Sequence, residues 1–585
     1  MTDTERNRDR DRRVIELYER VLEIEQRLIP TGLHVFGRVS NSNEIESLLK
    51  MVASFERSDI VIEPASGQTA PVKALTDLIA AGLGLPEYAA LLKESESSEE
   101  RLRDRERVES ILSEAVAIFV LDRSSQRAVD CLAATAFVPA HESVKVFEVL
   151  ARIRFELERS DELRSLSRAL RGEYIEPGPG ADIIQNPNVL PTGRNTHAVN
   201  PYTVPSSTAV RKAGPIVASL LERHTAETGR YPETMAMVLW GIDNIKTQGE
   251  AVAQALNLMG VRPRRDSLNR ATDVDVIPLA ELGRPRIDVV MTVSGIFRDL
   301  FGATMALLDK AVRTAAALDE PDDANFIRKH VQARMSEDRL SIDDAAARVF
   351  SNAAGNYGTN VNFMVLDSQW EDAGELGDLF VTRKCFAYGR GSDAREARAL
   401  LDRALAQVEL TYQNIDSTEV GITDVDHYFE YLGGVSKAVE KRSGSRPRVY
   451  LSDSTSPGSK VRTLEETIRL ETRTKTLNPK WYEGMLSHGF SGVAEIEHHV
   501  TNTFGWSATA DAVDKWVYDE VARTFVLDEE MLERLRGMNA HSTRSMIGRL
   551  LEASGRGLWA ADESMLNKLR EAFASLEDQL EGVTV

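Results

Sequence analysis

Four acidic and histidine side chains with the potential for chemistry lie close together in the second half of the chain: Asp424, Asp426, His427 and Glu430. His427 and Glu430 are three positions apart, so in a helix they share one face. An imidazole beside a carboxylate can remove a proton or bind a divalent cation. The alternative is that Asp424 or Thr423 caps a helix and the other side chains are solvated.

A proline-rich loop carries a second polar group that includes Arg194 and His197. Residues 176–205 show neither helical nor strand periodicity, and long loops in compact proteins are usually functional or disordered. The aromatic, arginine and histidine content argues against disorder. We expect an ordered loop that lines a site, where Arg194 can bind a carboxylate and His197 a metal ion or a proton. The alternative is that both side chains are hydrogen-bonding struts of the loop.

Two further histidine–carboxylate groups have plainer alternatives. Glu25 and His34 lie on either side of Pro30, which ends the first predicted helix. The alternative for Glu25 is a solvated charge on that helix, and for His34 a hydrogen-bonded histidine in the core. Glu495 lies three and four positions before His498 and His499, a pattern typical of the solvated face of an amphipathic helix.

A repeated strand–glycine–helix order must position several of these residues. Residues 234–240 and 287–293 predict buried strands, each followed by a glycine and a helix, which indicates a parallel α/β unit. In such sheets ligands bind beyond the carboxyl ends of the strands. We therefore expect residues 240–246 and 294–298 to lie side by side on the rim of the sheet, at the carboxyl ends of the strands. These segments contain Trp240, Asp243 and Arg298.

The remaining chain reads mostly as helices. Helices are expected over 14–29, 209–227, 248–259, 297–318 and 393–408 and from residue 460 onward, where breaks are expected at 478–479 and 503–506, and short strands over 275–278 and 448–451. The predicted fold class is a mostly helical, multi-domain α/β protein. Its expected parts are a helical region (1–170), a site-lining loop (171–213), a parallel α/β unit (214–318), a mixed α/β region (319–459) and a helical region (460–585).

Composition excludes several classes of protein. A length of 585 residues is enough for about four domains. The net charge of −20 disfavours nucleic acid as a partner. The two cysteines give no disulfide framework and fit a cytoplasmic protein, and no apolar run is long enough for a membrane span. The chain has no GxxxxGK[ST], GxGxxG, HExxH or GxSxG motif, so ATP hydrolysis by this chain is not expected.

Several blocks together resemble one family. They are Glu23-Ile-Glu-Gln-Arg-Leu-Ile-Pro-Thr-Gly-Leu-His-Val-Phe-Gly37, Pro191-Thr-Gly-Arg-Asn-Thr-His197, Val238-Leu-Trp-Gly-Ile-Asp-Asn-Ile-Lys-Thr247, Gly283-Arg-Pro-Arg-Ile-Asp-Val289 with Ser294-Gly-Ile-Phe-Arg-Asp-Leu-Phe301, and Asn478-Pro-Lys-Trp-Tyr-Glu-Gly484 with Gly505-Trp-Ser-Ala-Thr509. These blocks resemble the large, porphyrin-binding H-type polypeptide of magnesium chelatase, with cobalt chelatase CobN as a more distant relative. The resemblance covers the C-terminal half of that polypeptide.

The resemblance implies ATP-dependent insertion of Mg²⁺ into protoporphyrin IX in chlorophyll and bacteriochlorophyll synthesis. The AAA+ partners of the enzyme, its I and D subunits, would hydrolyse the ATP, and a separate chain can carry the N-terminal half. The implied catalytic residues are Glu25, His34, His197, His427 and Glu430, of which Glu25, His427 and Glu430 can also meet the metal ion. Arg194, Trp240, Asp243 and Arg298 are expected to bind the porphyrin. Glu430 stands where the family pattern has aspartate, which keeps the charge and lengthens the side chain.

Two rival functions remain open at this point. One is a CobN-like subunit that acts on a corrin precursor. The other is a non-catalytic tetrapyrrole-binding fragment.

Overall fold

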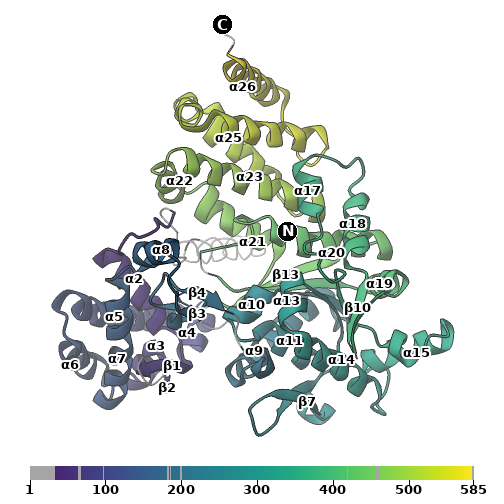
Figure 1. The fold of residues 1–585 in the computed structure, drawn as a ribbon, viewed down its shortest axis with the longest axis horizontal. Helices are drawn as coiled ribbons and strands as arrows, with labels where there is room; N and C mark the ends of the chain where they lie inside the picture. Colours follow the sequence, from purple (N-terminus) through teal and green to yellow (C-terminus); the bar gives the residue numbers. More distant parts are fainter. Residues whose placement is uncertain are drawn as a thin grey trace, which may run out of the picture.

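The computed structural model describes residues 21, 33–63, 68–95, 98–180, 183–184, 186–197, 200–389, 391–417, 419–455 and 460–582. Glu25 and nearly all of the helix predicted over 14–29 lie outside these residues. Three groups of elements are visible in Figure 1: a helical region, a sheet with its covering helices, and a stack of C-terminal helices. None of the described helices is long and apolar enough to cross a membrane.

The first region is helical, as the sequence predicts. Its core is formed by apolar faces such as Val108, Leu112, Val116 and Phe119 of α5, which pack against the neighbouring helices. The elements are α2 (Ser42–Ala53), β1 (Arg57–Glu63), β2 (Gln68–Val72), α3 (Leu75–Gly82), α4 (Tyr88–Glu94), α5 (Glu99–Asp122), α6 (Ser125–Ala136), α7 (Ala140–Leu157) and α8 (Glu162–Leu170).

An eight-stranded sheet forms the centre of the molecule. Its order is β11 (Gly391–Glu396), β10 (Phe386–Gly389), β9 (Val349–Ser351), β8 (Asp288–Val293), β5 (Thr234–Leu239), β12 (Leu410–Ile415), β13 (Arg448–Asp453) and β14 (Lys460–Thr463). The five strands from β9 to β13 are parallel, and antiparallel strands flank them on both sides. This confirms the predicted α/β class. The sheet takes strands from both sides of residue 318, and the division into five regions stays a prediction.

The chain reverses direction across the sheet next to β5. From β5 it runs to β8 and β9 on one side and then returns to β12 and β13 on the other. The topological switch point therefore lies between β5 and β12. In open α/β sheets this is where ligands bind, beyond the carboxyl ends of the strands.

Both faces of the sheet are covered, which explains why β5 and β8 are apolar along their whole length. In β5, Met235 and Met237 belong to one core, and Ala236 and Val238 belong to the other. The covering elements include α9 (Ser207–Thr228), α10 (Gly241–Lys246), α11 (Glu250–Leu258), α13 (Gly295–Leu300), α14 (Gly302–Ala316), α15 (Phe326–Glu337), α16 (Ile342–Ala345), α17 (Val361–Leu366), α18 (Gly374–Lys384), α19 (Arg398–Leu405) and α20 (Gly434–Ser443).

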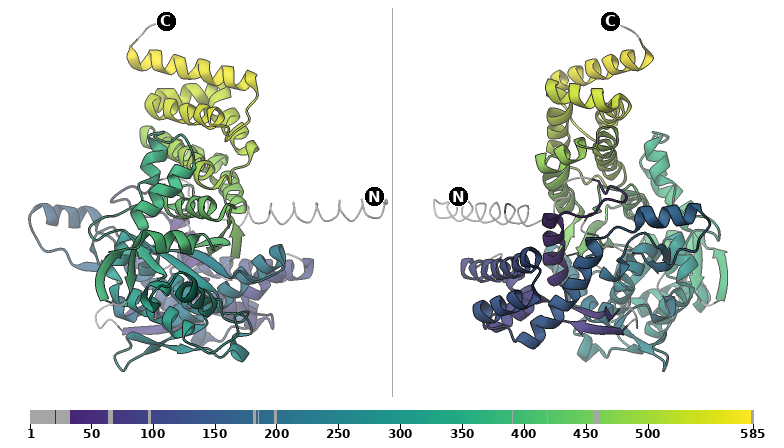
Figure 2. Two further views of the ribbon diagram at one scale, coloured as in Figure 1. Left: turned by 90° about the vertical axis from the view of Figure 1, so that its right-hand side faces the viewer. Right: turned by 60° about the vertical axis from the view of Figure 1, so that its left-hand side comes forward.

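The C-terminal helices stack away from the sheet, as both views in Figure 2 show. They are α21 (Leu464–Glu471), α22 (Pro479–Leu486), α23 (Phe490–Ala510), α24 (Lys515–Ala522), α25 (Glu529–Gly555) and α26 (Glu563–Glu581). The break expected at residues 503–506 is wrong, because α23 runs through it. Gly505 is there for a close approach: a Cβ at this position would lie 2.7 Å from the Phe429 ring.

Five strands of the sheet were not predicted from the sequence: β9, β10, β11, β12 and β14. The helix expected from residue 393 begins at Arg398, after β11. Helix was also expected from residue 460, but β14 occupies residues 460–463, where it pairs with β13, and α21 begins only at Leu464. The strand expected over 275–278 belongs to a separate hairpin of β6 (Val261–Arg265) and β7 (Ala271–Val276). β12 was missed because polar side chains interrupt its apolar sequence. These side chains can be buried because they are hydrogen-bonded; the Tyr412 hydroxyl, for example, donates to Gln254 Oε1 at 2.7 Å.

The long central loop contains more regular structure than expected. β3 (Pro177–Pro179) pairs in parallel with β4 (Asn195–His197), and short 3₁₀ turns form at η1 (Pro187–Val189) and η2 (Pro201–Thr203). The loop is therefore ordered over its described residues, as the aromatic and arginine content predicts.

Candidate functional site

The predicted rim forms at the carboxyl ends of β5 and β8. Ser294 Oγ accepts hydrogen bonds from Gly241 N at 3.0 Å and Phe297 N at 3.1 Å, which ties the starts of α10 and α13 together. Gly241 allows this approach, because a Cβ there would lie 2.5 Å from Cγ2 of Ile296. The two segments that sequence analysis placed on one rim are thus neighbours.

His427 and Glu430 form a contact pair beside this rim. His427 Nδ1 lies 3.0 Å from Glu430 Oε2, with Glu430 in a π-helical turn, η3 (Phe429–Gly433). Glu430 is buried, and its Oε1 accepts hydrogen bonds from Thr359 N, from Thr359 Oγ1 at 3.1 Å and from Asn360 N at 3.1 Å. The carboxylate therefore has its hydrogen-bonding capacity filled on one side by a loop and on the other by the imidazole.

The electrostatics of this pair set the protonation of His427. The hydrogen bond to Glu430 raises the pKa of His427 above its ordinary value, against the effect of burial. Burial alone would raise the pKa of Glu430, but the hydrogen bonds from His427 and Thr359 outweigh it and hold that pKa below its ordinary value. Since an ionised carboxylate only accepts, Nδ1 carries the proton. No described residue hydrogen-bonds Nε2, and the His427 side chain is 55% exposed.

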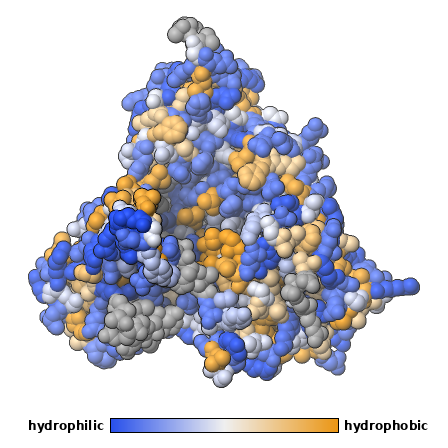
Figure 3. All heavy atoms as spheres, viewed as in Figure 1, coloured by the Kyte–Doolittle hydropathy of each residue, from blue (hydrophilic) through white to orange (hydrophobic). Residues whose placement is uncertain are grey.

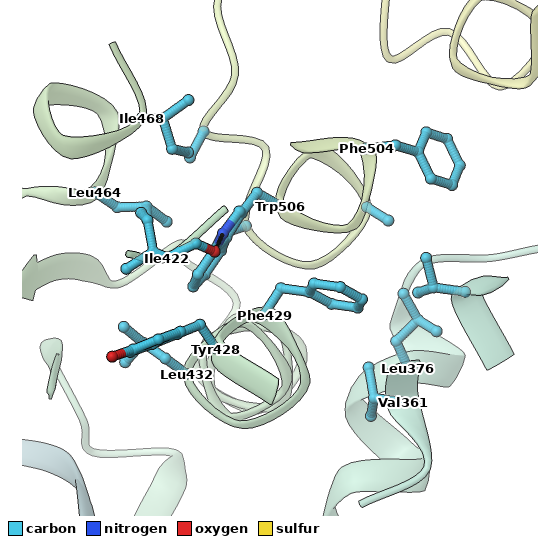
Figure 4. Close-up of a cluster of buried hydrophobic side chains, with 14 of the residues drawn as sticks. Val361, Leu376, Ile422, Tyr428, Phe429, Leu432, Leu464, Ile468, Phe504 and Trp506 are labelled. Atoms are coloured by element: carbon cyan, nitrogen blue, oxygen red, sulfur yellow. Dashed lines mark hydrogen bonds between the residues drawn. The ribbon is translucent and has the colours of Figure 1, made fainter. Parts of the chain in front are cut away.

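Aromatic rings line the space next to His427. The ring of Trp240, at the end of β5, lies 5.7 Å from the His427 ring, 5.8 Å from Tyr428 and 5.1 Å from Tyr431. Trp240 Nε1 is buried and has no hydrogen-bond partner among the described residues. Figure 4 shows Tyr428 and Phe429 packed in the core beneath, with the Trp506 side chain pointing toward them. This core fixes the helix that carries His427 and Glu430.

An exposed apolar surface adjoins the aromatic rings. We call Ile242, Ile296, Leu300 and Tyr357 the rim patch; these side chains are 36% to 53% exposed and lie on α10, α13 and the loop after β9. Figure 3 shows an apolar area where Figure 1 draws α10 and α13, next to a hollow bordered by the positions of α8, α10 and α21. A flat apolar ligand can lie against such a surface.

The switch point itself is acidic and buried. Asp243 Oδ1 accepts a hydrogen bond from Asn414 Nδ2 at 3.1 Å, and Asp416 Oδ2 pairs with Lys246 Nζ at 3.0 Å. Burial raises the pKa of Asp243 well above its usual value, and the negative charge of Asp416 adds to the rise. Asp243 is therefore a buried carboxyl that Asn414 of the neighbouring strand β12 holds in place.

Both arginines expected to bind the porphyrin are committed to backbone carbonyls. Arg194 donates to the carbonyl oxygens of Asn188, Val189, Leu190 and Pro191 at 3.0 to 3.2 Å, which fits the loop-strut alternative. Arg298 is buried and donates to three carbonyls, those of residues 352, 353 and 356, at 2.7 to 3.4 Å. Arg298 Nε also pairs with Asp299 Oδ1 at 2.7 Å, and the binding of the porphyrin by the two arginines stays a prediction.

Of the remaining predicted residues, only the His34 side chain lies within the described part of the structure. His34 Nε2 lies 3.3 Å from Glu162 of α8, and no contact among the described residues joins it to His427. His197 lies in β4, and its side chain is outside the described part of the structure, as is all of Glu25. Leu33 N donates to His488 Nε2 at 3.1 Å, so the segment before His34 reaches the C-terminal helices. Within the described residues no three histidine, cysteine or acidic side chains form a metal-binding group.

A second histidine–carboxylate pair was misread from the sequence. Asp424 is not a helix cap: its Oδ1 lies 2.8 Å from His499 Nε2, and Oδ2 pairs with Lys475. His499 is buried rather than solvated, and Thr423 bonds Glu471. Burial would raise the pKa of Asp424, but the charges of His499 and Lys475 hold it well below its ordinary value. No spacing rule signals this pair, because its members lie 75 residues apart.

Comparison with known proteins gives consistent matches over most of the chain. A family model described as CobN/Magnesium Chelatase matches residues 1–566. The chloroplastic magnesium-chelatase subunit ChlH of Oryza sativa subsp. indica is 42% identical over 98% of this chain and 43% of that protein. The H-type magnesium-chelatase polypeptide of Cereibacter sphaeroides is 47% identical over 77% of this chain and 37% of that protein.

A solved structure extends this similarity to the fold. The catalytic subunit of cobaltochelatase from Mycobacterium tuberculosis matches with a TM-score of 0.87 and 31% identity, over 97% of this chain and 47% of that chain. The chain thus spans less than half the length of each of these relatives.

Proposed function

Because the chain belongs to the CobN/magnesium chelatase family, we propose that it is part of the porphyrin-binding large subunit of a magnesium chelatase. The substrate would be protoporphyrin IX, into which Mg²⁺ is inserted during chlorophyll or bacteriochlorophyll synthesis. The finding that carries the proposal is the His427–Glu430 pair, which lies beside Trp240 at the end of β5, the strand that borders the switch point of the sheet.

The binding surface we propose is the rim patch with the rings around Trp240. The apolar macrocycle would lie against these side chains and bury them from water. The buried Trp240 Nε1 and the carboxyl of Asp243 are polar groups next to this surface. Arg194 and Arg298 would hold the loops of the site. Their binding of the porphyrin, which the resemblance implies, stays a prediction.

The reaction requires the loss of two pyrrole protons, and His427 is placed to accept one. Its Nδ1–H is held by Glu430, so the lone pair of Nε2 faces away from Glu430 and is free of described partners. The raised pKa of His427 makes the imidazole a stronger base, and Glu430 stabilises the imidazolium that forms. In this proposal His427 is the catalytic residue that takes the proton on Nε2, and Glu430 orients its imidazole.

Glu25, His34 and His197 complete the proposal as candidates for the second proton and for delivery of Mg²⁺. The described backbone supports a position near the hollow for two of the segments: Leu33 N reaches His488, and Gly193 lies close to Asp161 and Glu162 of α8.

We also propose that partners supply ATP hydrolysis. The sequence has no phosphate-binding loop motif, so the AAA+ partners, the I and D subunits, would hydrolyse the ATP. The reaction would take place in the cytoplasm.

A cobalt chelatase that acts on a corrin precursor is the second candidate, favoured by the structural match to cobaltochelatase. The higher identities to the magnesium enzymes, 42% and 47% against 31%, favour magnesium. A non-catalytic tetrapyrrole-binding fragment is the third.

Titration of the chain with protoporphyrin IX tests the binding surface. Quenching of tryptophan fluorescence should saturate at micromolar porphyrin, and Trp240→Phe should lose a large part of the quenching. Trp559→Phe is the matched control. Trp559 is buried among the C-terminal helices, and its Nε1 donates to Asp519 Oδ1 at 2.9 Å. Equal loss in both variants, or no quenching of the unmodified chain, would contradict the proposed surface.

Reconstitution separates the three candidate functions. With ATPase subunits, ATP, Mg²⁺ and a polypeptide that supplies the part of the family chain not spanned by this sequence, Mg-porphyrin absorbance should appear. Insertion of Co²⁺ into a corrin precursor in place of this product would support the second candidate. Binding without metal insertion under all conditions would support the third.

A further inference from the structure

We propose that Lys384 is a positioning residue: together with the loop of residues 352–360 it holds Glu430, and through Glu430 it orients His427. This inference rests on the proposed function. Lys384 lies at the end of α18, and neither its position nor its neighbours in the sequence resemble a site motif.

Lys384 is fully buried and joins two strand ends. Its Nζ donates to the carbonyl of Val293, at the end of β8, at 2.9 Å, and to Asn352 Oδ1, just after β9, at 2.8 Å. The ammonium also lies 4.2 Å from the centre of the Tyr431 ring. A buried lysine is costly unless its donors are satisfied, so these bonds define one position for Asn352.

Asn352 passes this constraint to the loop. Its Nδ2 donates to Gly358 O at 2.6 Å, while its own carbonyl accepts from the Tyr388 hydroxyl at 2.6 Å. Arg298 binds the same loop through the carbonyls of Ala353 and Asn356 at 2.7 and 2.8 Å. The loop is thereby fixed at both its start and its end.

The end of the loop is the part that grips Glu430. The amides of Thr359 and Asn360 both point at Glu430 Oε1, and a Cβ on Gly358 would lie 3.0 Å from this same oxygen. A shift of Gly358 would therefore move the amides away from the carboxylate. The ordered path runs from Lys384 through Asn352 and Gly358 to Glu430, and from Glu430 Oε2 to His427 Nδ1.

Electrostatics support the same connection. Burial lowers the pKa of Lys384 to about 7, and the negative charge of Glu430 opposes that fall, whereas Arg298 and Arg383 add to it. Conversely, the positive charge of Lys384 favours the ionised form of Glu430. Loss of Lys384 would remove this charge and loosen the amides, so burial would raise the pKa of Glu430 and weaken its hold on His427.

The test combines chelation kinetics with histidine spectroscopy on Lys384→Met. We expect kcat to fall by up to about 100-fold, since small misplacements of catalytic groups have effects of this size, with KM for protoporphyrin nearly unchanged. In spectra of ¹³C-labelled histidine, the His427 resonance should titrate at lower pH than in the unmodified chain. His427→Asn identifies that resonance among those of the ten histidines.

A matched lysine provides the control. Lys437→Met removes another nearly buried lysine, whose Nζ pairs with Glu440 at 2.6 Å on α20 and has no contact with the loop. It should leave kcat and the His427 titration unchanged. Asn352→Asp is a second variant for the case in which Lys384→Met does not fold: it keeps the acceptor for Lys384 but removes the donor to Gly358, and should reproduce the fall in kcat and in the His427 pKa.

The outcomes separate this inference from the proposed function. If the unmodified chain binds protoporphyrin and supports chelation, but Lys384→Met and Asn352→Asp both keep its kcat and its His427 titration, the positioning role is wrong. If the unmodified chain neither binds nor chelates, the proposed function is wrong. The His427 titration would then still report whether Lys384 acts on the pair.

Discussion

The chain contains two histidine–carboxylate pairs that differ in what surrounds them. In the Asp424–His499 pair both histidine nitrogens are engaged: Nε2 faces Asp424 at 2.8 Å and Nδ1 faces Thr423 Oγ1 at 3.2 Å. In the His427–Glu430 pair only Nδ1 has a described partner, and the histidine is half exposed at the sheet edge. A histidine–carboxylate pair thus serves the structure where both imidazole nitrogens are hydrogen-bonded. It is available for reaction where one nitrogen has no described partner.

The substitution His427→Asn tests most strongly whether the exposed pair is the reactive one. The amide of asparagine can still donate to Glu430, but it provides no base. We expect the chelation rate to fall by about 10²- to 10⁴-fold, the range for loss of a general base, with protoporphyrin affinity and Tm little changed. A chelation rate close to that of the unmodified chain would remove His427 from the reaction.

Asp424→Asn should affect stability instead. The change leaves Lys475 and His499 buried without their carboxylate, and breaking a buried pair costs about 3 kcal/mol or more. Trp481, whose ring lies 4.4 Å from the His499 ring, reports the unfolding of this region by its fluorescence in urea. An unchanged urea midpoint would show that the pair contributes nothing to the fold.

Glu430→Gln should shift the pH dependence of chelation. The hydrogen bond from His427 to the carboxylate raises the pKa of His427, so its loss lowers that pKa. His427 must be neutral to accept a proton, and the rise of rate with pH should therefore occur at lower pH in the variant, with a smaller maximum. A shift toward higher pH, or none, would mean that Glu430 does not control His427.

The smallest expected effect is on stability against pH, where the two pairs have opposite signs. The raised pKa of His427 stabilises the fold below about pH 6.5, and this contribution is lost as pH rises through the folded pKa. The lowered pKa of Asp424 stabilises the fold above about pH 3.9 and is lost as pH falls. Accordingly, the Tm advantage over His427→Asn should shrink from pH 5 to 9, and that over Asp424→Asn should shrink on acidification.

The local sequence pattern was sufficient to predict those strands whose apolar residues follow one another without interruption. β5 and β8 are buried on both faces, so the sequence analysis found them, their following helices and the shared rim. β12 was missed because Thr411, Gln413 and Asn414 interrupt its apolar run, and these side chains are buried in the switch-point region. The polar segment of β12 can form a buried strand because its side chains are hydrogen-bonded to residues distant in the sequence.

The candidate site shows the same limit. His427 and Glu430 were found because they share one helix face. The partners that distinguish this pair from a solvated one, Thr359 and Asn360, come from a loop about 70 positions away in the chain. Likewise, the burial of His499 follows from Asp424 and Trp481, which no spacing in the sequence could relate to it.

The most direct test of the central claim compares the two pairs in one experiment. ¹³C-labelled histidine spectra of the chain are recorded as protoporphyrin IX is added to saturation. We predict that the His427 resonance shifts with the binding isotherm while the His499 resonance stays in place. A His427 resonance that does not move at saturating porphyrin would contradict a porphyrin site beside the His427–Glu430 pair.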